Sequence, residues 1–393
     1  MICLYEAQKL ILEATPVLGR ESVPILDSLR RVLAQDIVAM EDFPASDISA
    51  KDGYAVRHAS LRGASRQSPV HLRIIGESAA GRPCGAIVGD GEAVRIMTGG
   101  MVPEGADTVV RLELTAEDHG YVICTNDSKP GGDIRFRGES LKKDAVVFRA
   151  GTVVSPLEVG ALASLRRAYV YVHRKPLVAI LTTGDELTDF HEQPSPWKAM
   201  SSNLYALAAQ VLETGAIPLC LGIVKDDLNA QQSILSEALR ADVIITSGGM
   251  SMGKYDLIQE TFASLGMDMH FSTILGKPGK PSIFGKIGRN LVFGLPGNPS
   301  AAMISFEQFI TPALLKMMGH LNIAHISNDR LECNGSGPVS LIDGYTRGEA
   351  DNPGEHWASL IPLRAPFPGN LKKRQKQKKA VGARPGLSVM VAN

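Results

Sequence analysis

LVAILTTGDE at residues 177–186 joins an apolar run to a glycine turn and two acidic residues. The same order, an apolar run followed by a glycine loop, recurs in VIITSGGMSMG at 243–253 and in LVFGLPGNPS at 291–300. Each apolar run predicts a buried strand, and strands buried on both faces are typical of parallel sheets. In such sheets the loops lie at the carboxyl ends of the strands, where α/β proteins bind their ligands. These segments therefore predict both the fold of this region and the position of its site.

Residues 176–320 alternate regularly between strand patterns and helix patterns. Apolar runs predict the strands, and apolar stripes at helical spacing predict the helices between them. Regular alternation implies right-handed crossovers and a doubly wound sheet. The expected strands cover 177–181, 217–224, 243–246 and 291–293, and the expected helices cover 203–213, 228–239, 256–265 and 300–317, with a short apolar segment at 269–275.

The remaining sequence predicts a multidomain protein of the α/β plus β class. An amphipathic helix is expected at 3–15, and another after Ser155-Pro156, with Ser155 as its cap and Pro156 at the first helical position. From 43 to 151 short β-type runs alternate with Gly, Pro and Asp, and beyond 319 the periodicity fades. The predicted domains are an elongated N-terminal domain of helix and strands (1–42 and 130–175), a β-rich domain (43–129), a doubly wound α/β domain (176–320) and a small, divergent C-terminal β domain (321–393).

Composition and charge limit the classes of partner. With 393 residues the chain is long enough for roughly two to four domains. Lys plus Arg balance Asp plus Glu at 41 each, so no net charge attracts nucleic acid or anionic lipid, and a small-molecule ligand is expected. The five cysteines include no CxxC pair, which is typical of reduced thiols, and no long apolar run or basic leader occurs. We therefore expect a soluble cytoplasmic protein without nucleic-acid or membrane partners.

The glycine loop at 247–253 predicts an anion site. Its glycines let backbone N–H groups converge on one point, and the helix that follows adds its positive end. Glycine turns between strand and helix also occur for packing reasons alone, so anion binding and plain packing are equal alternatives here. The residues expected to contact a phosphate are Ser247, Gly248, Gly249, Ser251 and Gly253.

Acidic residues gather after the predicted strand ends: Asp185, Glu186, Asp226, Asp227 and Asp256. Carboxylates beside a phosphate need a cation between them, and a hard ion such as Mg²⁺ suits oxygen ligands. Helix capping is the favoured alternative for Asp226 or Asp227 and for Asp256 when each is taken singly. Capping does not explain Glu186, so the set as a whole predicts a metal site.

Two stiff turns complete the predicted edge. Lys277 and Lys280 in KPGKP at 277–281 supply point charges for phosphate or a tetrahedral oxyanion, and the alternative is a solvated surface turn. Pro296 and Asn298 belong to the turn GLPGNP at 294–299, for which a wall of the site and a purely structural turn are equally favoured.

Eight short motifs resemble those of one known family. SAKDGYAV at 49–56 is similar to the family's SAMDGYAV, and RIMTG at 95–99 and VPEGAD at 102–107 are similar to two further segments. The sheet region adds TGDEL (183–187), SSN (201–203), SGGxSxGxxD (247–256), KPGKP (277–281) and GLPGNP (294–299). Together they cover roughly residues 1–318 in family order, which makes a chance match negligible. The chain resembles the MoeA-type molybdopterin molybdenumtransferases, or molybdenum insertases, which include the carboxyl-terminal E domain of gephyrin.

The resemblance implies an enzyme of molybdenum cofactor biosynthesis. Its reaction would take adenylated molybdopterin and molybdate as substrates, place the metal on the dithiolene and release AMP with help from Mg²⁺. The resemblance also implies a MogA-like sheet domain and a homodimer with a shared active site. The protein partners that it suggests are a MogA-like adenylyltransferase and molybdoenzyme apoproteins.

The matching motifs carry the family's site residues over to this chain. Asp52, Glu186, Asp226 and Asp256 are implied as catalytic residues, and the last three also as Mg²⁺ ligands that orient an attacking water or molybdate oxygen. The loop at 247–253 would hold the pterin-side phosphate, and Asp52 with Thr98 would close the cleft from the partner subunit. The implied ligand-binding residues are Thr98, Ser247, Gly248, Gly249, Ser251, Gly253, Lys277, Lys280, Pro296 and Asn298, the two lysines being assigned to molybdate or the terminal phosphate.

Three features depart from the family pattern and leave alternatives open, one of them being Thr273, which stands where some members carry a further basic residue. Lys51 replaces the usual Met, where it would either pair with Asp52 or contact an anionic substrate. The C-terminal region has no QGSG motif and carries a basic tract at 371–379. One alternative is therefore a non-catalytic molybdopterin-binding carrier or scaffold. Another is a different enzyme on the same sheet, such as a MogA-like adenylyltransferase or a CinA-like nucleotide hydrolase, although the DGYAV and RIMTG segments have no role in a lone sheet domain.

Overall fold

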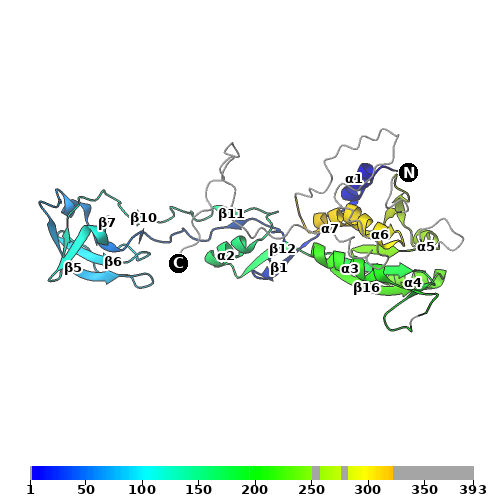
Figure 1. Cartoon of the computed structure of the whole chain (residues 1–393). Helices are drawn as coiled ribbons and strands as arrows, with labels where there is room; N and C mark the ends of the chain where they lie inside the picture. The colour runs from blue at the N-terminus through cyan, green and yellow to red at the C-terminus, as the bar shows by residue number, and fades with distance from the viewer. Residues whose placement is uncertain (1, 194, 250–256, 276–281, 322–393) are drawn as a thin grey trace, which may run out of the picture. The chain divides into compact units, whose positions relative to one another are not determined.

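The computed structural model describes residues 2–193, 195–249, 257–275 and 282–321. They group into two units, one made of residues up to 35 and from 150 onward, the other of residues 36–149 (Figure 1). Apart from its first residue, the predicted C-terminal domain lies outside the described residues. Because two units are a coarser division than the four predicted domains, the four-domain organisation stays a prediction.

The first unit is built on a six-stranded sheet with the strand order β16-β13-β17-β20-β19-β18. β19 (Ile283–Ile287) and the edge strand β18 (Asp268–Phe271) run antiparallel to their neighbours. The other four run parallel and confirm the predicted succession of strands and glycine loops. These four are β16 (Ile217–Val224), β13 (Leu177–Thr183), β17 (Val243–Ser247) and β20 (Asn290–Leu295).

β19 is a strand that the sequence patterns did not predict. It pairs with β20, and the register partners Ile287 and Asn290 leave only Gly288-Arg289 to connect the two strands. Gly288 has a φ of 57°, which two-residue hairpin turns require and glycine adopts without steric cost. Such a turn reverses the chain without a helix, so the alternation of strand and helix breaks here and the sheet becomes mixed.

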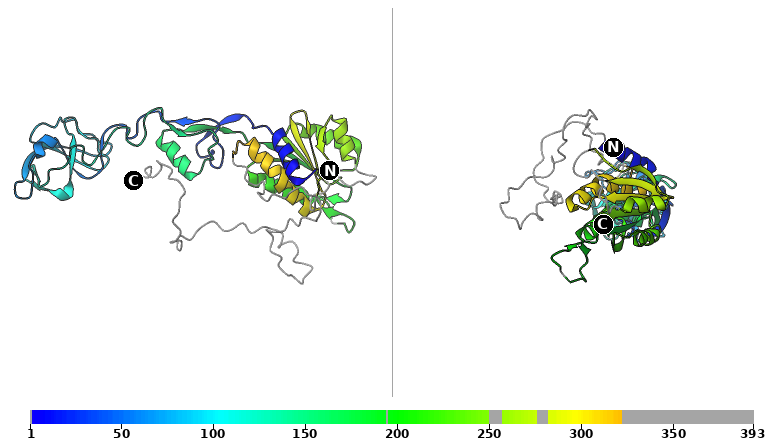
Figure 2. Two further views of the ribbon diagram at one scale, coloured as in Figure 1. Left: turned by 90° about the horizontal axis from the view of Figure 1, so that it is seen from above. Right: turned by 90° about the vertical axis from the view of Figure 1, so that its right-hand side faces the viewer.

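Helices cover both faces of this sheet (Figure 1 and Figure 2). One buried cluster takes Val178 and Ile180 from β13, and the other takes Ala179 and Leu181 from the same strand. Alternate residues of a strand point to opposite faces, so this division is expected of a strand between two helix layers. The first layer holds α1 (Leu4–Ala14), α3 (Ser202–Thr214), α6 (Pro299–Ser305) and α7 (Thr311–Met317), and the second holds α4 (Leu228–Ala238) and α5 (Ile258–Ser264).

The helix predicted at 300–317 is interrupted by a π-helical turn at Phe306–Ile310. The interruption lies directly before the first turn of α7, which contains Pro312. Proline has no N–H for the ladder of a continuing α-helix, and a π turn changes the backbone pairing at such a place.

No helix in the described ranges is both long enough and apolar enough to cross a membrane.

The rest of the first unit contains one strand pair and the helix α2, whose start confirms the predicted cap at Ser155. β1 (Arg20–Pro24) pairs antiparallel with β12 (Tyr169–His173), and α2 (Pro156–Ser164) precedes β12 in the chain. Leu157 N donates to Ser155 Oγ at 3.2 Å, and Ser155 N donates to Glu158 Oε2 at 2.9 Å. This reciprocal capping box, with proline at the first helical position, fixes the start of α2.

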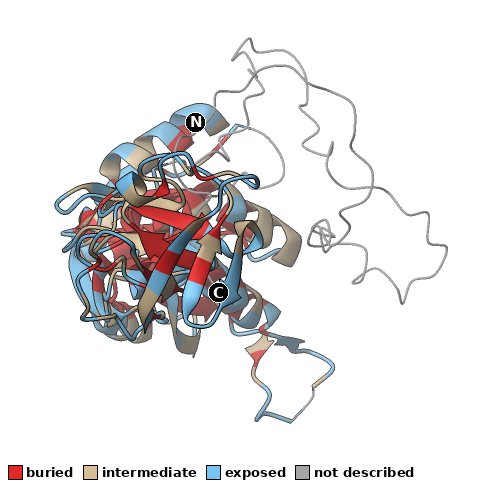
Figure 3. Cartoon of the chain, turned by 90° about the vertical axis from the view of Figure 1, so that its left-hand side faces the viewer, coloured by how far each residue is buried: buried red, intermediate tan, exposed pale blue. Residues whose placement is uncertain are grey.

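The second unit confirms the β-rich prediction. Its main sheet has the strand order β7-β4-β6-β5-β9-β8, and buried residues concentrate in its strands (Figure 3). β4 lies between β6 and β7, and a Cβ on Gly53 would lie 2.0 Å from the Val110 carbonyl oxygen, so only glycine fits. The elements are β4 (Gly53–Val56), β5 (Val70–Ser78), β6 (Glu92–Ile96), β7 (Thr108–Arg111), β8 (Thr115–Asp118) and β9 (Tyr121–Cys124), the 3₁₀ turns η1 (His58–Leu61) and η2 (Leu112–Leu114), and the short pairs β2 (Ile37–Val38) with β11 (Val146–Phe148) and β3 (Ile48–Ser49) with β10 (Ile134–Arg135).

Candidate functional site

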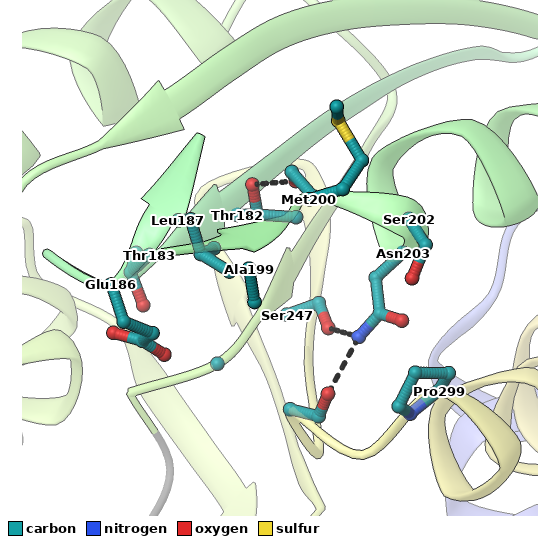
Figure 4. Close-up of a pocket in the computed structure, with 13 residues that line it drawn as sticks. Thr182, Thr183, Glu186, Leu187, Ala199, Met200, Ser202, Asn203, Ser247 and Pro299 are labelled. Carbon is teal, nitrogen blue, oxygen red and sulfur yellow. Dashed lines mark hydrogen bonds between the residues drawn. The ribbon is translucent and has the colours of Figure 1, made fainter. Parts of the chain in front are cut away.

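A cavity of about 470 Å³ lies at the carboxyl ends of β13 and β17 (Figure 4). A two-stranded parallel sheet formed by β14 (Leu187–Thr188) and β15 (Ala199–Met200) borders the cavity, together with the first turn of α3. This is the edge of the sheet at which the glycine loops predicted a site. The lining residues are Thr182, Thr183, Glu186, Leu187, Ala199, Met200, Ser201, Ser202, Asn203, Ser247, Gly248, Gly297 and Pro299.

Asn203 joins the loops that line this cavity. Its Nδ2 donates to Ser247 Oγ at 2.8 Å and to the Gly297 carbonyl at 2.9 Å. Ser247 Oγ in turn donates to the Pro296 carbonyl at 3.0 Å. The loops after β17 and β20 are therefore held against the first turn of α3 by one network of hydrogen bonds.

This network defines what the predicted phosphate loop offers to a ligand. The Ser247 hydroxyl proton is used by Pro296, and Gly248 N donates to the Leu295 carbonyl at 3.2 Å. Both groups thus stabilise the loop itself, which is what the packing interpretation of the loop predicts. A phosphate contact from this loop falls to residues that follow Gly248, and of these Ser251 and Gly253 lie outside the described residues.

The glycines of the loop allow it to approach the end of β13. Gly248 has a φ of 98°, and a Cβ there would lie 2.4 Å from the Thr183 carbonyl oxygen. A Cβ on Gly249 would lie 2.7 Å from Thr183 Oγ1. The close neighbour of Gly248 is a backbone atom, so glycine is required there, and at Gly249 a φ of 62° adds to the preference for glycine.

Two buried polar atoms at the cavity, Thr183 Oγ1 and Asn203 Oδ1, have no hydrogen-bond partner among the described residues. A buried polar atom without a partner costs about 1–3 kcal/mol, so its place beside a cavity indicates a ligand or water there. Ser201, the N-cap of α3, makes no capping bond, and its Oγ pairs with Thr182 Oγ1 at 2.8 Å. The N-terminus of α3 adds partial positive charge at the same place, which favours an anionic ligand.

The predicted acidic cluster divides in two. Ala230 N donates to Asp227 Oδ1 at 2.8 Å, so Asp227 caps α4 as the capping alternative proposed. Asp226 N donates to Asp185 Oδ1 at 3.4 Å. Burial, followed by the charges of Asp185 and Glu186, raises the pKa of Asp226. These three carboxylates therefore gather at this edge and repel one another.

The chemistry of these carboxylates fits Mg²⁺. A divalent cation relieves repulsion between carboxylates, and Mg²⁺ usually takes one or two of them and completes its shell with phosphate oxygens and water. In the part of the chain that the structure describes, no group of three His, Cys, Asp or Glu side chains is placed to hold a metal ion. Glu186 and Asp226 are the predicted donors found here, and Asp256, the third predicted ligand, lies outside the described residues.

The GLPGNP turn has structural contacts. Ala301 N donates to Asn298 Oδ1 at 3.1 Å, so Asn298 caps α6, with Pro299 at the start of the helix. Pro296 is buried, and its carbonyl accepts the Ser247 proton. The remaining predicted contacts, Lys277 and Lys280, lie outside the described residues.

In the second unit the predicted pair Asp52 and Thr98 lies together. Thr98 N and Thr98 Oγ1 both donate to Asp52 Oδ1 at 2.7 Å. These bonds, the backbone bond first, lower the pKa of Asp52 below the usual value of an aspartate, because they favour its charged form. Asp52 precedes β4 and Thr98 follows β6, and because these strands are antiparallel both residues lie at one end of the sheet. Both are exposed and thus accessible to a ligand.

Neighbouring residues of the same motifs support that end of the sheet. Tyr54 is buried, and its hydroxyl donates to Glu117 Oε2 at 2.8 Å. Burial and this hydrogen bond raise the pKa of Tyr54 to about 12. Arg95 pairs with the same carboxylate at 3.4 Å. The DGYAV and RIMTG segments therefore stabilise the sheet as well as presenting Asp52 and Thr98.

Known proteins match both units. A family model described as the MoeA N-terminal region, domains I and II, matches residues 2–165, and one described as a probable molybdopterin binding domain matches residues 179–316. The molybdopterin molybdenumtransferase of Nostoc sp. is 36% identical over 330 residues, which cover 80% of this chain and 76% of that protein. The molybdopterin molybdenumtransferase of Bacillus subtilis is 39% identical over 299 residues, which cover 75% and 70%.

The chain belongs to the molybdopterin molybdenumtransferase family. The crystal structure of the molybdopterin biosynthesis MoeA protein from Pyrococcus horikosii matches it with a TM-score of 0.74 at 31% identity, over 81% of each chain. The predicted MoeA resemblance and multidomain fold class are thereby confirmed. As a member of this family the chain is an enzyme of the transferase class.

The predicted site of this family member omitted Thr182, Thr183 and Asn203, which line the cavity. Asn203 belongs to the SSN segment, and its place at the start of the helix after the TGDEL loop was the available signal. Thr182 and Thr183 have the sequence pattern of a strand end. Only the position of the neighbouring loops shows that Thr183 Oγ1 lacks a partner.

Proposed function

We propose that this transferase inserts molybdenum from molybdate into adenylated molybdopterin and releases AMP, forming the molybdenum cofactor. The observation that carries the proposal is the cavity at the ends of β13 and β17, which combines unpaired polar atoms with the carboxylate of Glu186, and Glu186 in turn interacts with Asp226. The cavity lies in the stretch that matches a probable molybdopterin binding domain. The related proteins from Nostoc sp. and Bacillus subtilis are named for a transfer of this kind.

The proposed release of AMP is a displacement at phosphorus. An oxygen of water or molybdate bonds to the phosphorus attached to molybdopterin, the bridging P–O bond breaks, and AMP leaves with the bridging oxygen and the bonding electrons. Glu186, which lines the cavity, and Asp226, which interacts with it, would orient an attacking water, whose proton passes to solvent.

We also propose that Glu186, Asp226 and Asp256 hold Mg²⁺. The bound ion would offset the charge of the substrate phosphates. The repulsion that raises the pKa of Asp226 supports this assignment, because a cation lowers the free energy of adjacent carboxylates. Lys277 and Lys280 are proposed to bind molybdate or the terminal phosphate, and the loop after Gly248 the pterin-side phosphate.

The enzyme is further proposed to act as a cytoplasmic homodimer in which Asp52 and Thr98 of the partner subunit complete the site. The two hydrogen bonds from Thr98 support this role, because they keep the exposed Asp52 carboxylate charged and oriented. A MogA-like adenylyltransferase would supply the substrate, and molybdoenzyme apoproteins would receive the product.

Molybdate-dependent AMP release tests the proposed function. The full chain is mixed with adenylated molybdopterin, Mg²⁺ and molybdate, and AMP is quantified by chromatography. We expect release that requires molybdate and that falls about 100-fold in Glu186→Gln. Asp227→Asn is the matched control, because Asn also caps helices and Asp227 does not line the cavity. Absence of AMP release from a chain that still binds molybdopterin would refute the transferase reaction and favour a carrier.

A further inference from the structure

The orientation of the Asn203 amide is fixed by its neighbours. The Gly297 carbonyl only accepts hydrogen bonds, so the atom facing it at 2.9 Å is Nδ2. Ser247 has a single hydroxyl proton, which it donates to the Pro296 carbonyl, so it accepts from Asn203 at 2.8 Å. Both Nδ2 protons are thereby used. Turning the amide over would bring Oδ1 against a carbonyl oxygen and leave Ser247 without its donor.

Asn203 Oδ1 is consequently a buried acceptor with a fixed orientation. It has no partner among the described residues, and Asn203 is 8% exposed. Figure 4 shows the amide nitrogen directed to Ser247 and Gly297 and the oxygen on the other side. Thr183 Oγ1, the second unpaired atom at the cavity, belongs to a hydroxyl that either donates or accepts. An amide oxygen only accepts, so the cavity favours a ligand that presents a donor to Asn203.

The parts of the proposed substrate differ in what they offer to such an acceptor. Phosphate diesters and molybdate carry acceptor oxygens, so neither satisfies Asn203 Oδ1. A pterin carries an amino group and a ring N–H on its pyrimidine edge, and the adenosine part carries an amino group and hydroxyls. The match of residues 179–316 to a probable molybdopterin binding domain favours the pterin as the occupant.

We propose that Asn203 is a specificity-determining residue whose Oδ1 accepts a hydrogen bond from an N–H group on the pyrimidine edge of the pterin. The inference rests on the proposed function, because it places the pterin in this cavity. Since Nδ2 of the same amide holds the loops after β17 and β20, Asn203 also couples pterin binding to the position of these loops.

Binding of two simple probes tests this role without catalysis. The probes are 6-hydroxymethylpterin and AMP, titrated separately into the full chain by isothermal calorimetry. Asn203→Ala removes both the acceptor and the loop bonds. Ser247→Ala is the matched control, because it breaks a bond of the same network and keeps Asn203 Oδ1. The thermal unfolding midpoint of each variant measures the loss of the loop bonds.

We expect Asn203→Ala to weaken pterin binding about tenfold and to change AMP binding by less than about threefold. Ser247→Ala should affect both probes to a similar, small extent. If Asn203→Ala weakened the binding of both probes equally, and Ser247→Ala did the same, Asn203 would only hold the loops in place and the proposal would be overturned. A loss confined to AMP would assign the donor to adenosine and overturn it as well. No pterin binding by the unmutated chain would refute the proposed function, whereas pterin binding insensitive to Asn203→Ala would refute the inference alone.

Discussion

Gly248→Ala is expected to destabilise the first unit and to distort the cavity. Gly248 has a φ of 98°, and a Cβ there would lie 2.4 Å from the Thr183 carbonyl oxygen, whereas real Cβ contacts essentially never fall below 3.0 Å. The loop or the end of β13 must therefore move by at least 0.6 Å, the difference between these two distances. Both segments line the cavity, so the movement also displaces the groups that face a ligand.

The magnitude follows from two contributions. A residue other than glycine in this region of φ costs about 1–3 kcal/mol of backbone strain. The movement also weakens the bonds from Gly248 N to Leu295 and from Ser247 Oγ to Pro296, each of which contributes about 1 kcal/mol. We therefore expect the free energy of unfolding to fall by about 2–4 kcal/mol.

Gly222→Ala separates the strain from the steric clash. Gly222 has a φ of 90°, and no atom lies within 4 Å of its Cβ position. This control should lose only the strain contribution, about 1–3 kcal/mol, and less than Gly248→Ala loses. Urea unfolding followed by far-ultraviolet circular dichroism reports on the first unit, because the described α-helices belong to it. If Gly248→Ala lost no more stability than Gly222→Ala, the close approach of the loop to β13 would be wrong.

Three further predictions concern single carboxylates. Burial and neighbouring carboxylates raise the folded-state pKa of Asp226 above its ordinary value of 3.8. Its contribution to the free energy of unfolding therefore falls as the pH rises from 3.8 through the raised folded-state pKa. Asp226→Asn should raise the urea midpoint near neutral pH, leave it unchanged below pH 3.8 and abolish AMP release. A midpoint gain that persists at low pH would contradict the electrostatic cause. Asp227→Ala removes the cap from Ala230 N and should cost about 1 kcal/mol in urea unfolding without slowing AMP release. Thr98→Val removes one of two donors to Asp52, so the Asp52 pKa should rise in an NMR titration and the acid limb of the activity profile should shift to higher pH; an unmoved carboxyl pKa would show that the Thr98 hydroxyl does not stabilise the charge.

Most of the fold was predictable because the spacing of apolar residues along the chain indicates which side chains of a strand or helix are buried. Strand β16 was predicted with its observed limits, and α3 and α4 within one residue at each end. The β19 strand was missed because a hairpin turn needs only two residues, Gly288 and Arg289, and leaves no helical period between strands. The break in the helix at 306–310 was missed because its buried residues Phe306, Phe309 and Ile310 keep the i, i+3, i+4 spacing that predicts an α-helix.

The candidate site was predictable to the level of segments rather than of atoms. Asp226 and Asp227 are adjacent in sequence and equally acidic, yet one caps α4 and the other lies beside two carboxylates. Ser247 carries a hydroxyl suited to phosphate, and that hydroxyl is used within the protein. No sequence signal other than the SSN segment pointed to Asn203, although its side chain holds three segments together.

The sequence by itself determined which segments form strands and helices, that ligand-binding loops follow the strands, and which family the motifs resemble. It could do so because periodicity, capping and glycine turns depend on residues close together in the chain. The tertiary structure alone decided which polar groups are satisfied and which remain unpaired at the cavity. Asn203 meets Ser247 and Gly297, and Asp52 meets Thr98, across long stretches of sequence. Hydrogen bonds of this kind depend on how distant segments pack, so only the folded chain shows that Asn203 Oδ1 lacks a partner.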